Sequence, residues 1–179
     1  MKKRDHTMKL ARPQVAFAGL VVLGMTTLTA CSAASLPNTG SEPVRDAESG
    51  QVTESSDAVD VFSIRVGDCL NTSELSGETE LESVPIVPCD EPHEDEVYHA
   101  FDSASSEFPG TDALSAEADE TCIAEFATFV GTPWEESALE YWPMYPSEQS
   151  WAGGDREILC MLYDPTVETV TGTLAGAAR

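Results

Sequence analysis

The sequence predicts an α+β domain: a small antiparallel sheet with one main amphipathic helix packed on one face, stapled by two disulfides. Three observations lead to this fold class. Several short segments have strand patterns, one long segment has a helical pattern, and four of the five cysteines lie in the part expected to fold. Several strands with a single helix are typical of an antiparallel sheet that carries its helix on one face. The 41% of hydrophobic residues in the 179-residue chain are enough for a core.

The first 30 residues have the organisation of a secretory signal peptide. Basic residues precede an apolar run over 15–25, and Leu28-Thr29-Ala30-Cys31 matches the bacterial lipobox. The run is shorter than the about 20 apolar residues that a membrane span needs. We therefore expect cleavage before Cys31 and lipidation of this cysteine, which holds the protein on the extracytoplasmic face of the cell membrane. The alternatives are an ordinary signal peptide with an incidental cysteine, or an uncleaved anchor.

Residues 31–60 are expected to be the lipidated cysteine followed by a disordered acidic linker. After Cys31 this stretch is rich in Ser, Ala, Glu, Asp, Thr, Pro and Gly, and it holds no aromatic residue. Such a composition buries too little apolar surface to offset the entropy of ordering. The folded domain is predicted to cover residues 61–176.

The mature chain is strongly acidic. Five of the nine basic residues and one of the 32 acidic residues lie in the first 30, so four arginines and no lysine remain against 31 acids. A surface of this charge repels phosphate backbones and anionic headgroups, which excludes nucleic-acid binding. Attachment to the membrane must then come from the lipid and not from a polybasic patch.

Three strands are expected before the helix. Residues 61–66 alternate, with Phe62, Ile64 and Val66 on one face. Residues 84–89 are apolar but contain two prolines, which favours an edge strand. Residues 96–101 alternate again.

The helix is predicted over 112–130, with Thr111 or Asp112 as its N-cap and with Gly131 and Pro133 after its end. Residues 139–145 and 157–163 are predicted strands, and the second is apolar on both faces and therefore central. Residues 147–151 resemble a short helical turn, and a last short strand is expected over 170–174. The apolar stripe of the helix consists of Leu114, Ala118, Cys122, Ile123, Phe126, Ala127 and Val130.

The four cysteines of the domain are expected to form two disulfides, for which three pairings exist. Cys122 lies on the apolar stripe of the helix, and Cys160 shares a strand face with Ile158 and Leu162. A helix packed on that face brings these two cysteines together, so the predicted pairs are Cys122–Cys160 and Cys69–Cys89. The competing hypothesis is a metal site that uses Cys89 and His93. It is disfavoured because zinc sites usually have close ligand pairs on both halves.

Four blocks of sequence resemble the septum formation domain family of actinobacterial cell-envelope proteins. They are Val66-Gly-Asp-Cys-Leu70; Val87-Pro-Cys-Asp-Glu-Pro-His-Glu-Asp-Glu-Val97; Tyr145-Pro-Ser-Glu-Gln-Ser-Trp-Ala-Gly-Gly-Asp-Arg156; and Cys160-Met-Leu-Tyr-Asp164 with Thr171-Gly-Thr-Leu174. The resemblance covers nearly all of residues 61–176, with the blocks in the family's order. It implies an exported or membrane-tethered protein of cell division or envelope growth, and it implies no reaction.

Five residues are candidates for partner binding: His93, Glu96, Trp151, Asp155 and Arg156. His93 follows a predicted disulfide in a loop, where contact with a backbone carbonyl is the favoured alternative. Arg65 and Arg156 are expected to be paired with carboxylates, Arg156 in a bidentate clamp. Trp151 belongs to an aromatic-rich segment over 141–151, from which a side chain could stack on a sugar.

The sequence thus predicts a lipid-anchored binding or scaffold protein of division-septum or envelope assembly, not an enzyme, with no catalytic residue, metal or cofactor assigned. No nucleophile elbow, zinc-protease motif or phosphate loop is present. Its partners are the membrane, through the anchor, and an envelope or division protein. The alternative function is an envelope glycan (peptidoglycan) binding module without a division role, followed by a thiol-redox or hydrolytic enzyme.

Overall fold

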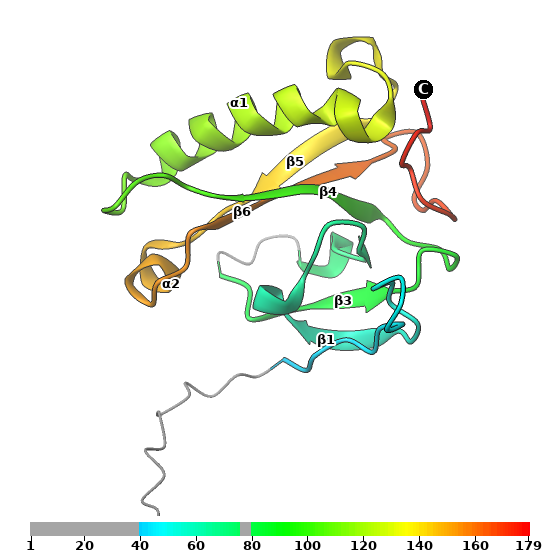
Figure 1. The fold of residues 1–179 in the computed structure, drawn as a ribbon, viewed down its shortest axis with the longest axis horizontal. Helices are drawn as coiled ribbons and strands as arrows, with labels where there is room; N and C mark the ends of the chain where they lie inside the picture. The colour runs from blue at the N-terminus through cyan, green and yellow to red at the C-terminus, as the bar shows by residue number, and fades with distance from the viewer. Residues whose placement is uncertain (1–39, 76–79) are drawn as a thin grey trace, which may run out of the picture. The chain divides into compact units, whose positions relative to one another are not determined.

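The computed structural model describes residues 40–75 and 80–179, and the signal segment and Cys31 lie outside the described residues. Within the described part, α1 covers one face of the sheet formed by β4, β6 and β5 (Figure 1). This arrangement confirms the predicted α+β class. The strands are β1 (Ser56–Asp60), β2 (Cys69–Leu70), β3 (Ser83–Val87), β4 (Asp95–Asp102), β5 (Glu140–Met144) and β6 (Glu157–Tyr163). The helices are α1 (Thr111–Val130) and α2 (Glu148–Ala152), with 3-10 turns η1 (Val61–Ser63), η2 (Ser73–Leu75) and η3 (Trp134–Glu136).

The described strands form one sheet in the order β1-β3-β2-β4-β6-β5, and every neighbouring pair is antiparallel. Strand β6 lies between β4 and β5, as its two apolar faces predicted. Ile158, Cys160 and Leu162 pack on the side of α1, whereas Leu159 and Met161 pack on the opposite side. The sheet therefore has a core on both faces, and β6 contributes to both.

Both predicted disulfides are present. Cys122 of α1 is bonded to Cys160 of β6, with a Cα–Cα distance of 5.5 Å. Cys69 of β2 is bonded to Cys89, with a Cα–Cα distance of 5.3 Å. The first disulfide ties the helix to the sheet, and the second ties β2 to the turn that follows β3.

Helix α1 begins at Thr111 and ends at Val130, close to the predicted range. The sequence predicted Thr111 or Asp112 as the N-cap, but the N-cap residue is Gly110, and no side chain forms a capping hydrogen bond. Gly131 ends the helix with φ of 89°, a left-handed conformation that glycine adopts without steric cost. The buried residues of the helix are Leu114, Ala118, Cys122, Phe126 and Val130.

The strand predicted over 61–66 is wrong. The strand at this point, β1, ends at Asp60, and the 3-10 turn η1 follows it. The carboxylate of Asp60 accepts a hydrogen bond of 3.0 Å from the backbone N–H of Phe62 and caps this turn. Ile64 is buried, whereas Phe62 is 63% exposed, so the alternating residues do not share a buried face.

Strand β3 is not the edge strand that its prolines suggested. It lies between β1 and β2, and β1 forms the edge. The register of β1 shifts between Ser56 and Val59, opposite Pro85 of β3. Because the pairing is already irregular there, the missing N–H of this proline is tolerated in an inner strand.

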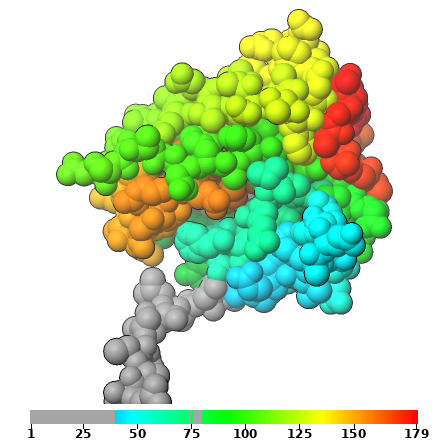
Figure 2. Space-filling view, in the orientation of Figure 1, coloured from blue at the N-terminus to red at the C-terminus, as the bar shows by residue number. Residues whose placement is uncertain are grey.

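The domain also includes residues that the sequence assigned to the disordered linker. The segment from residue 40 onward, cyan in Figure 2, packs directly against the rest of the domain. Val52 and Val59 are 7% and 0% exposed and belong to the core that contains Leu159 and Met161. Two isolated valines in a polar stretch thus complete the face of the sheet opposite α1.

Arg45 fastens this segment to the domain. Its guanidinium binds both carboxylate oxygens of Asp68, at 2.5 and 2.6 Å, and donates to the carbonyls of Gly50 and Ser63. The bidentate clamp that the sequence assigned to Arg156 is therefore made by Arg45. In the described part the only other ion pair joins Arg179 to Asp164, and Arg65 is exposed.

Replacing Arg45 by lysine is expected to destabilise the domain by about 2 kcal/mol, because an ammonium cannot bind both oxygens of Asp68 and reach two carbonyls as well. Thermal unfolding followed by circular dichroism measures the loss. Arg65→Lys, on an exposed arginine, is the matched control and should leave the midpoint unchanged. Equal midpoints for the two variants would contradict a clamping role for Arg45.

Candidate functional site

The five candidate residues from the sequence do not form one cluster. His93 and Glu96 lie at the start of β4, whereas Trp151, Asp155 and Arg156 lie in or beside α2, ahead of β6. Glu96 pairs with Leu162, and the α2 group adjoins Glu157 at the other end of β6. Five residues of strand separate these positions, which is about 17 Å. The five candidate residues are therefore divided between two ends of the sheet.

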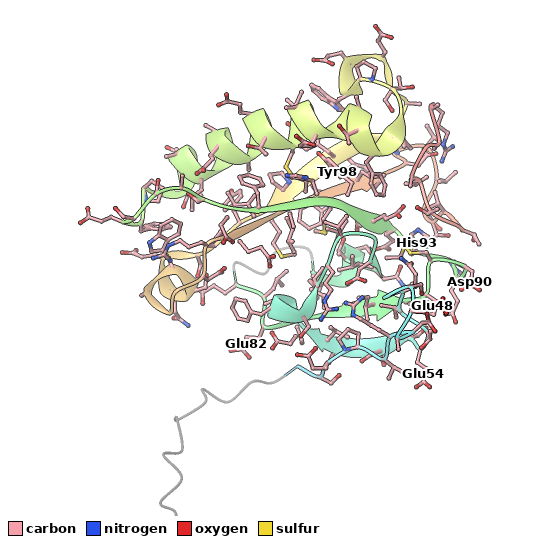
Figure 3. The ribbon with its side chains drawn as sticks, viewed as in Figure 1. Glu48, Glu54, Glu82, Asp90, His93 and Tyr98 are labelled. Carbon is pink, nitrogen blue, oxygen red and sulfur yellow. A yellow bond between two sulfur atoms is a disulfide. The ribbon has the colours of Figure 1, made fainter. Side chains whose placement is uncertain are left out.

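His93 is fully buried, at the turn where the chain enters β4 (Figure 3). Its ring Nδ1 lies 2.9 Å from the carbonyl oxygen of Glu91, and its backbone pairs with Val170 through bonds of 3.0 and 2.8 Å. This pairing is a single bridge, so the strand predicted over 170–174 is reduced to one position. A side chain in this environment fixes the turn and cannot contact a partner directly.

Glu96 holds the C-terminal segment against the sheet. The side chain is 1% exposed, and its oxygens accept hydrogen bonds from the Thr173 hydroxyl at 2.5 Å and the Leu174 N–H at 2.6 Å. Burial raises the pKa of this carboxyl. Leu174 itself is buried in the core beneath α1. Glu96 thus has a structural role that its position in a polar motif did not indicate.

Trp151 and Arg156 contact each other at the other end of β6. Trp151 is 5% exposed and does not project outward. The Arg156 guanidinium lies 3.8 Å above its ring and donates to the backbone carbonyls of Trp151 and Asp155, at 2.9 and 2.5 Å. These contacts replace the expected pairing with a carboxylate. A cation over an indole face is a stabilising arrangement, so this pair fixes α2 to the sheet.

One group of three side chains in the described part has the spacing of metal ligands: Cys69, Cys89 and Glu96, with ligand atoms within 4.8 Å of one another. Both sulfur atoms belong to the same disulfide. A disulfide offers no thiolate, and a metal ligand of this type must be a thiolate. The donor set therefore does not fit a metal ion while the disulfide is intact.

A large open groove lies on the sheet face opposite α1, beside the start of β4. Its volume is about 870 Å³. Four acidic and two aromatic residues line it: Glu94, Asp95, Asp164, Glu168, Trp142 and Tyr163. Leu75, Leu81 and Val167 add an apolar part, and Val167 is 52% exposed. Aromatic, apolar and charged groups in one concave surface are typical of a binding site.

Asp95 and Trp142 are fixed to each other in this groove. The indole Nε1 of Trp142, on β5, donates to Oδ1 of Asp95 at 2.7 Å, and the Thr72 hydroxyl donates to Oδ2. Asp95 is only 4% exposed, and its burial raises the pKa of the carboxyl. Glu94 accepts a bond of 2.7 Å from the N–H of Ser73. The groove is therefore preorganised by hydrogen bonds between β4, β5 and the turn η2.

Sequence reasoning missed most of this groove. Trp142 lies in the aromatic-rich segment, and Glu94, Asp95, Tyr163 and Asp164 lie in the family-like blocks, but Glu168 carries no signal of its own. These residues come from three strands and a loop, so only the sheet order brings them together. In so acidic a chain, single carboxylates cannot be told apart by sequence.

Stability should depend on pH through the buried carboxyls. Asp95 and Glu96 have pKa values raised by burial above their ordinary 3.8 and 4.5. Their contribution to stability is full below the ordinary pKa and is lost as pH rises through the raised pKa. The thermal midpoint is therefore expected to rise as pH falls from neutral through the raised pKa values towards these ordinary ones.

The opposite trend is expected at lower pH, because hydrogen bonds from Thr166 lower the pKa of Asp164 below 3.8. A thermal melt series across this range measures both trends. The double variant Asp95→Asn with Glu96→Gln should show a smaller rise over the same fall in pH. An identical pH profile in this variant would show that other groups cause the rise.

Comparison with known protein families shows to which family the chain belongs. A family model described as "Septum formation" matches residues 66–178. The chain belongs to the septum formation family. Family membership links the protein to septum formation and confirms the resemblance seen in the sequence. The match includes the groove residues of the septum formation domain but begins after Arg45. No curated protein and no solved structure matches the chain.

Among the described residues of this septum formation protein, no helix has the length and apolar character needed to cross a membrane.

Proposed function

We propose that this protein is a lipid-anchored, extracytoplasmic binding protein of the division septum, and that it acts by binding and not by catalysis. The groove opposite α1 carries this proposal, because it is a preorganised concave surface with aromatic, apolar and charged groups. Family membership supports the link with the septum. The groove is thus the surface through which the protein would hold a partner at the site of division.

The extracytoplasmic location is supported by the lipobox at Leu28–Cys31 and by the two disulfides. Disulfides persist in oxidising environments outside the cytoplasm. The absence of a catalytic role is supported by the histidines of the described part. His93 is fully buried, and the ring of the half-buried His99 lies 5.8 Å from that of Phe101.

The proposed anchor places the domain close to the membrane. Residue 40 is the first described residue of the domain, and eight residues lie between it and Cys31. At about 3.5 Å for each fully extended residue, this length allows at most about 30 Å between lipid and domain. A partner must therefore lie near the outer surface of the membrane. A tether that continued to residue 60 would have reached about three times as far.

The anchor is tested by labelling cells with a fatty acid that carries a chemical tag. The wild-type chain should take up the label and stay in the membrane fraction, and Cys31→Ala should do neither. Cys122 and Cys160 serve as internal controls, because disulfide-bonded cysteines are not acylated. Equal labelling of Cys31→Ala would contradict the proposed anchor.

A further inference from the structure

We infer that the groove opposite α1 binds a basic, amphipathic segment of a partner protein, rich in lysine or arginine. This inference rests on the proposed binding function and specifies the partner's chemistry. Glu94, Asp95 and Glu168 line the groove, and no lysine or arginine is among its described lining residues. A cationic segment is the occupant whose charge complements this surface.

The arginines of the described part do not neutralise these three carboxylates. Arg45 binds Asp68, Arg156 lies on Trp151, and the exposed Arg65 is not among the residues that line the groove. Arg179 binds Asp164, which is the one carboxylate of the groove that has a cationic partner within the described chain. The groove thus presents three acidic groups that have no cationic partner among the described residues and that an external cation can pair.

Because Asp95 is buried, a negative charge on its carboxyl without a cationic partner costs more free energy than the same charge on a surface acid. The side chain is 4% exposed and accepts bonds from Trp142 and Thr72, neither of which carries a charge. Carboxylates buried to this degree are usually paired with a cation. A lysine or arginine that entered the groove would supply the missing charge beside the face of Trp142, where cation–π attraction adds to it.

The apolar lining of the groove determines the second property expected of the bound segment, which is that it carries apolar as well as basic side chains. Leu75 and Leu81 pack against the core, and Val167 is 52% exposed at the groove. A segment with only charged residues would leave this part of the surface in contact with water. A segment in which basic and aliphatic residues alternate satisfies both halves, which is how extended or helical peptides bind grooves.

The test is a fluorescence titration of the full-length lipidated chain in a neutral detergent. The probe is a twelve-residue peptide of alternating leucine with lysine or arginine, and the control peptide carries glutamate at the basic positions. The basic peptide should change the tryptophan emission saturably, and Trp142→Phe should abolish that change. The glutamate peptide should give no change.

The matched variants are Glu94→Gln with Glu168→Gln in the groove and Glu135→Gln with Glu136→Gln on η3, which contacts α1 on the opposite face. Glutamine at position 94 keeps an acceptor for the N–H of Ser73. The groove pair should weaken peptide binding about tenfold, and the control pair should leave it unchanged. Equal weakening by both pairs would show non-specific attraction and would overturn the inference.

A peptidoglycan fragment, the disaccharide with its stem peptide, is titrated in parallel. Saturable binding of this fragment without binding of the basic peptide would overturn the inference in favour of a glycan occupant. No binding of the basic peptide would also overturn it. The proposed function is tested separately by septal localisation. If the protein reaches the septum but does not bind the peptide, the proposed function stands and only the inference about the bound segment fails.

Discussion

Replacement of both Cys122 and Cys160 by alanine is expected to lower the free energy of unfolding by about 4 kcal/mol. The two residues are 38 positions apart, and their disulfide joins α1 to β6 within the core. The closed loop sets the entropy lost by the unfolded chain, and longer loops give larger effects. Thermal unfolding should show the midpoint falling by about 12 °C for a domain of this size.

The second disulfide provides the comparison. Cys69 and Cys89 are 20 positions apart, so their joint replacement should cost about 3 kcal/mol, less than the first pair. Cys89 is also less buried than Cys122 or Cys160. If removal of the Cys69–Cys89 bond destabilised the domain more than removal of the Cys122–Cys160 bond, the helix–sheet disulfide would not be the stronger of the two constraints on the fold.

Glu96→Ala is expected to destabilise the domain by about 3 kcal/mol, because it leaves the Thr173 hydroxyl and the buried Leu174 N–H without an acceptor. The C-terminal segment should then detach from β4. Native-state hydrogen exchange measures this directly, since the amides of Leu174 and Val170 should lose protection together.

Glu96→Gln is the matched control, because it keeps one acceptor oxygen at the same position. It should retain part of the protection at Leu174 and lose less stability than Glu96→Ala. Protection at the Leu174 amide that is unchanged in Glu96→Ala would rule out a holding role for this carboxylate. A loss confined to thermal stability, with the segment still protected, would do the same.

Sequence patterns predicted the half of the domain that contains α1 and β6 well. The helix has a continuous apolar stripe with a glycine after its end, and β6 is apolar on both faces. Such local patterns determine element type without reference to the rest of the chain. They also placed Cys122 and Cys160 on facing surfaces, which is why the disulfide pairing could be predicted.

The other half of the sheet depends on contacts between distant residues. Strand β1 has the sequence Ser-Asp-Ala-Val-Asp, which contains one large apolar residue, and it pairs with β3 about 27 positions later. Val52 and Arg45 join the domain through contacts with residues far along the chain. No local pattern marks such residues, so the sequence placed the whole segment in the linker.

In the candidate site, too, some residues are marked by a local sequence pattern and others are brought together only by the fold. The motif around His93 stands out in the sequence for its polar residues, but the structure buries His93 and Glu96. Their neighbours Glu94 and Asp95 line the groove instead. Asp95 and Glu96 are both buried, Asp95 in the groove and Glu96 against Leu174 on the side of α1, and strand register determines which of the two faces the groove. Register of this kind cannot be derived from a run of similar acidic residues.

The central claim is that the septum formation domain brings the anchored protein to the site of division. The most direct test is the position of a full-length copy in dividing cells, tagged with a fluorophore that matures outside the membrane. We expect a band at the division plane, and an even rim around the cell when residues 40–179 are deleted and the lipobox is kept. An even rim for the full-length protein would contradict the claim.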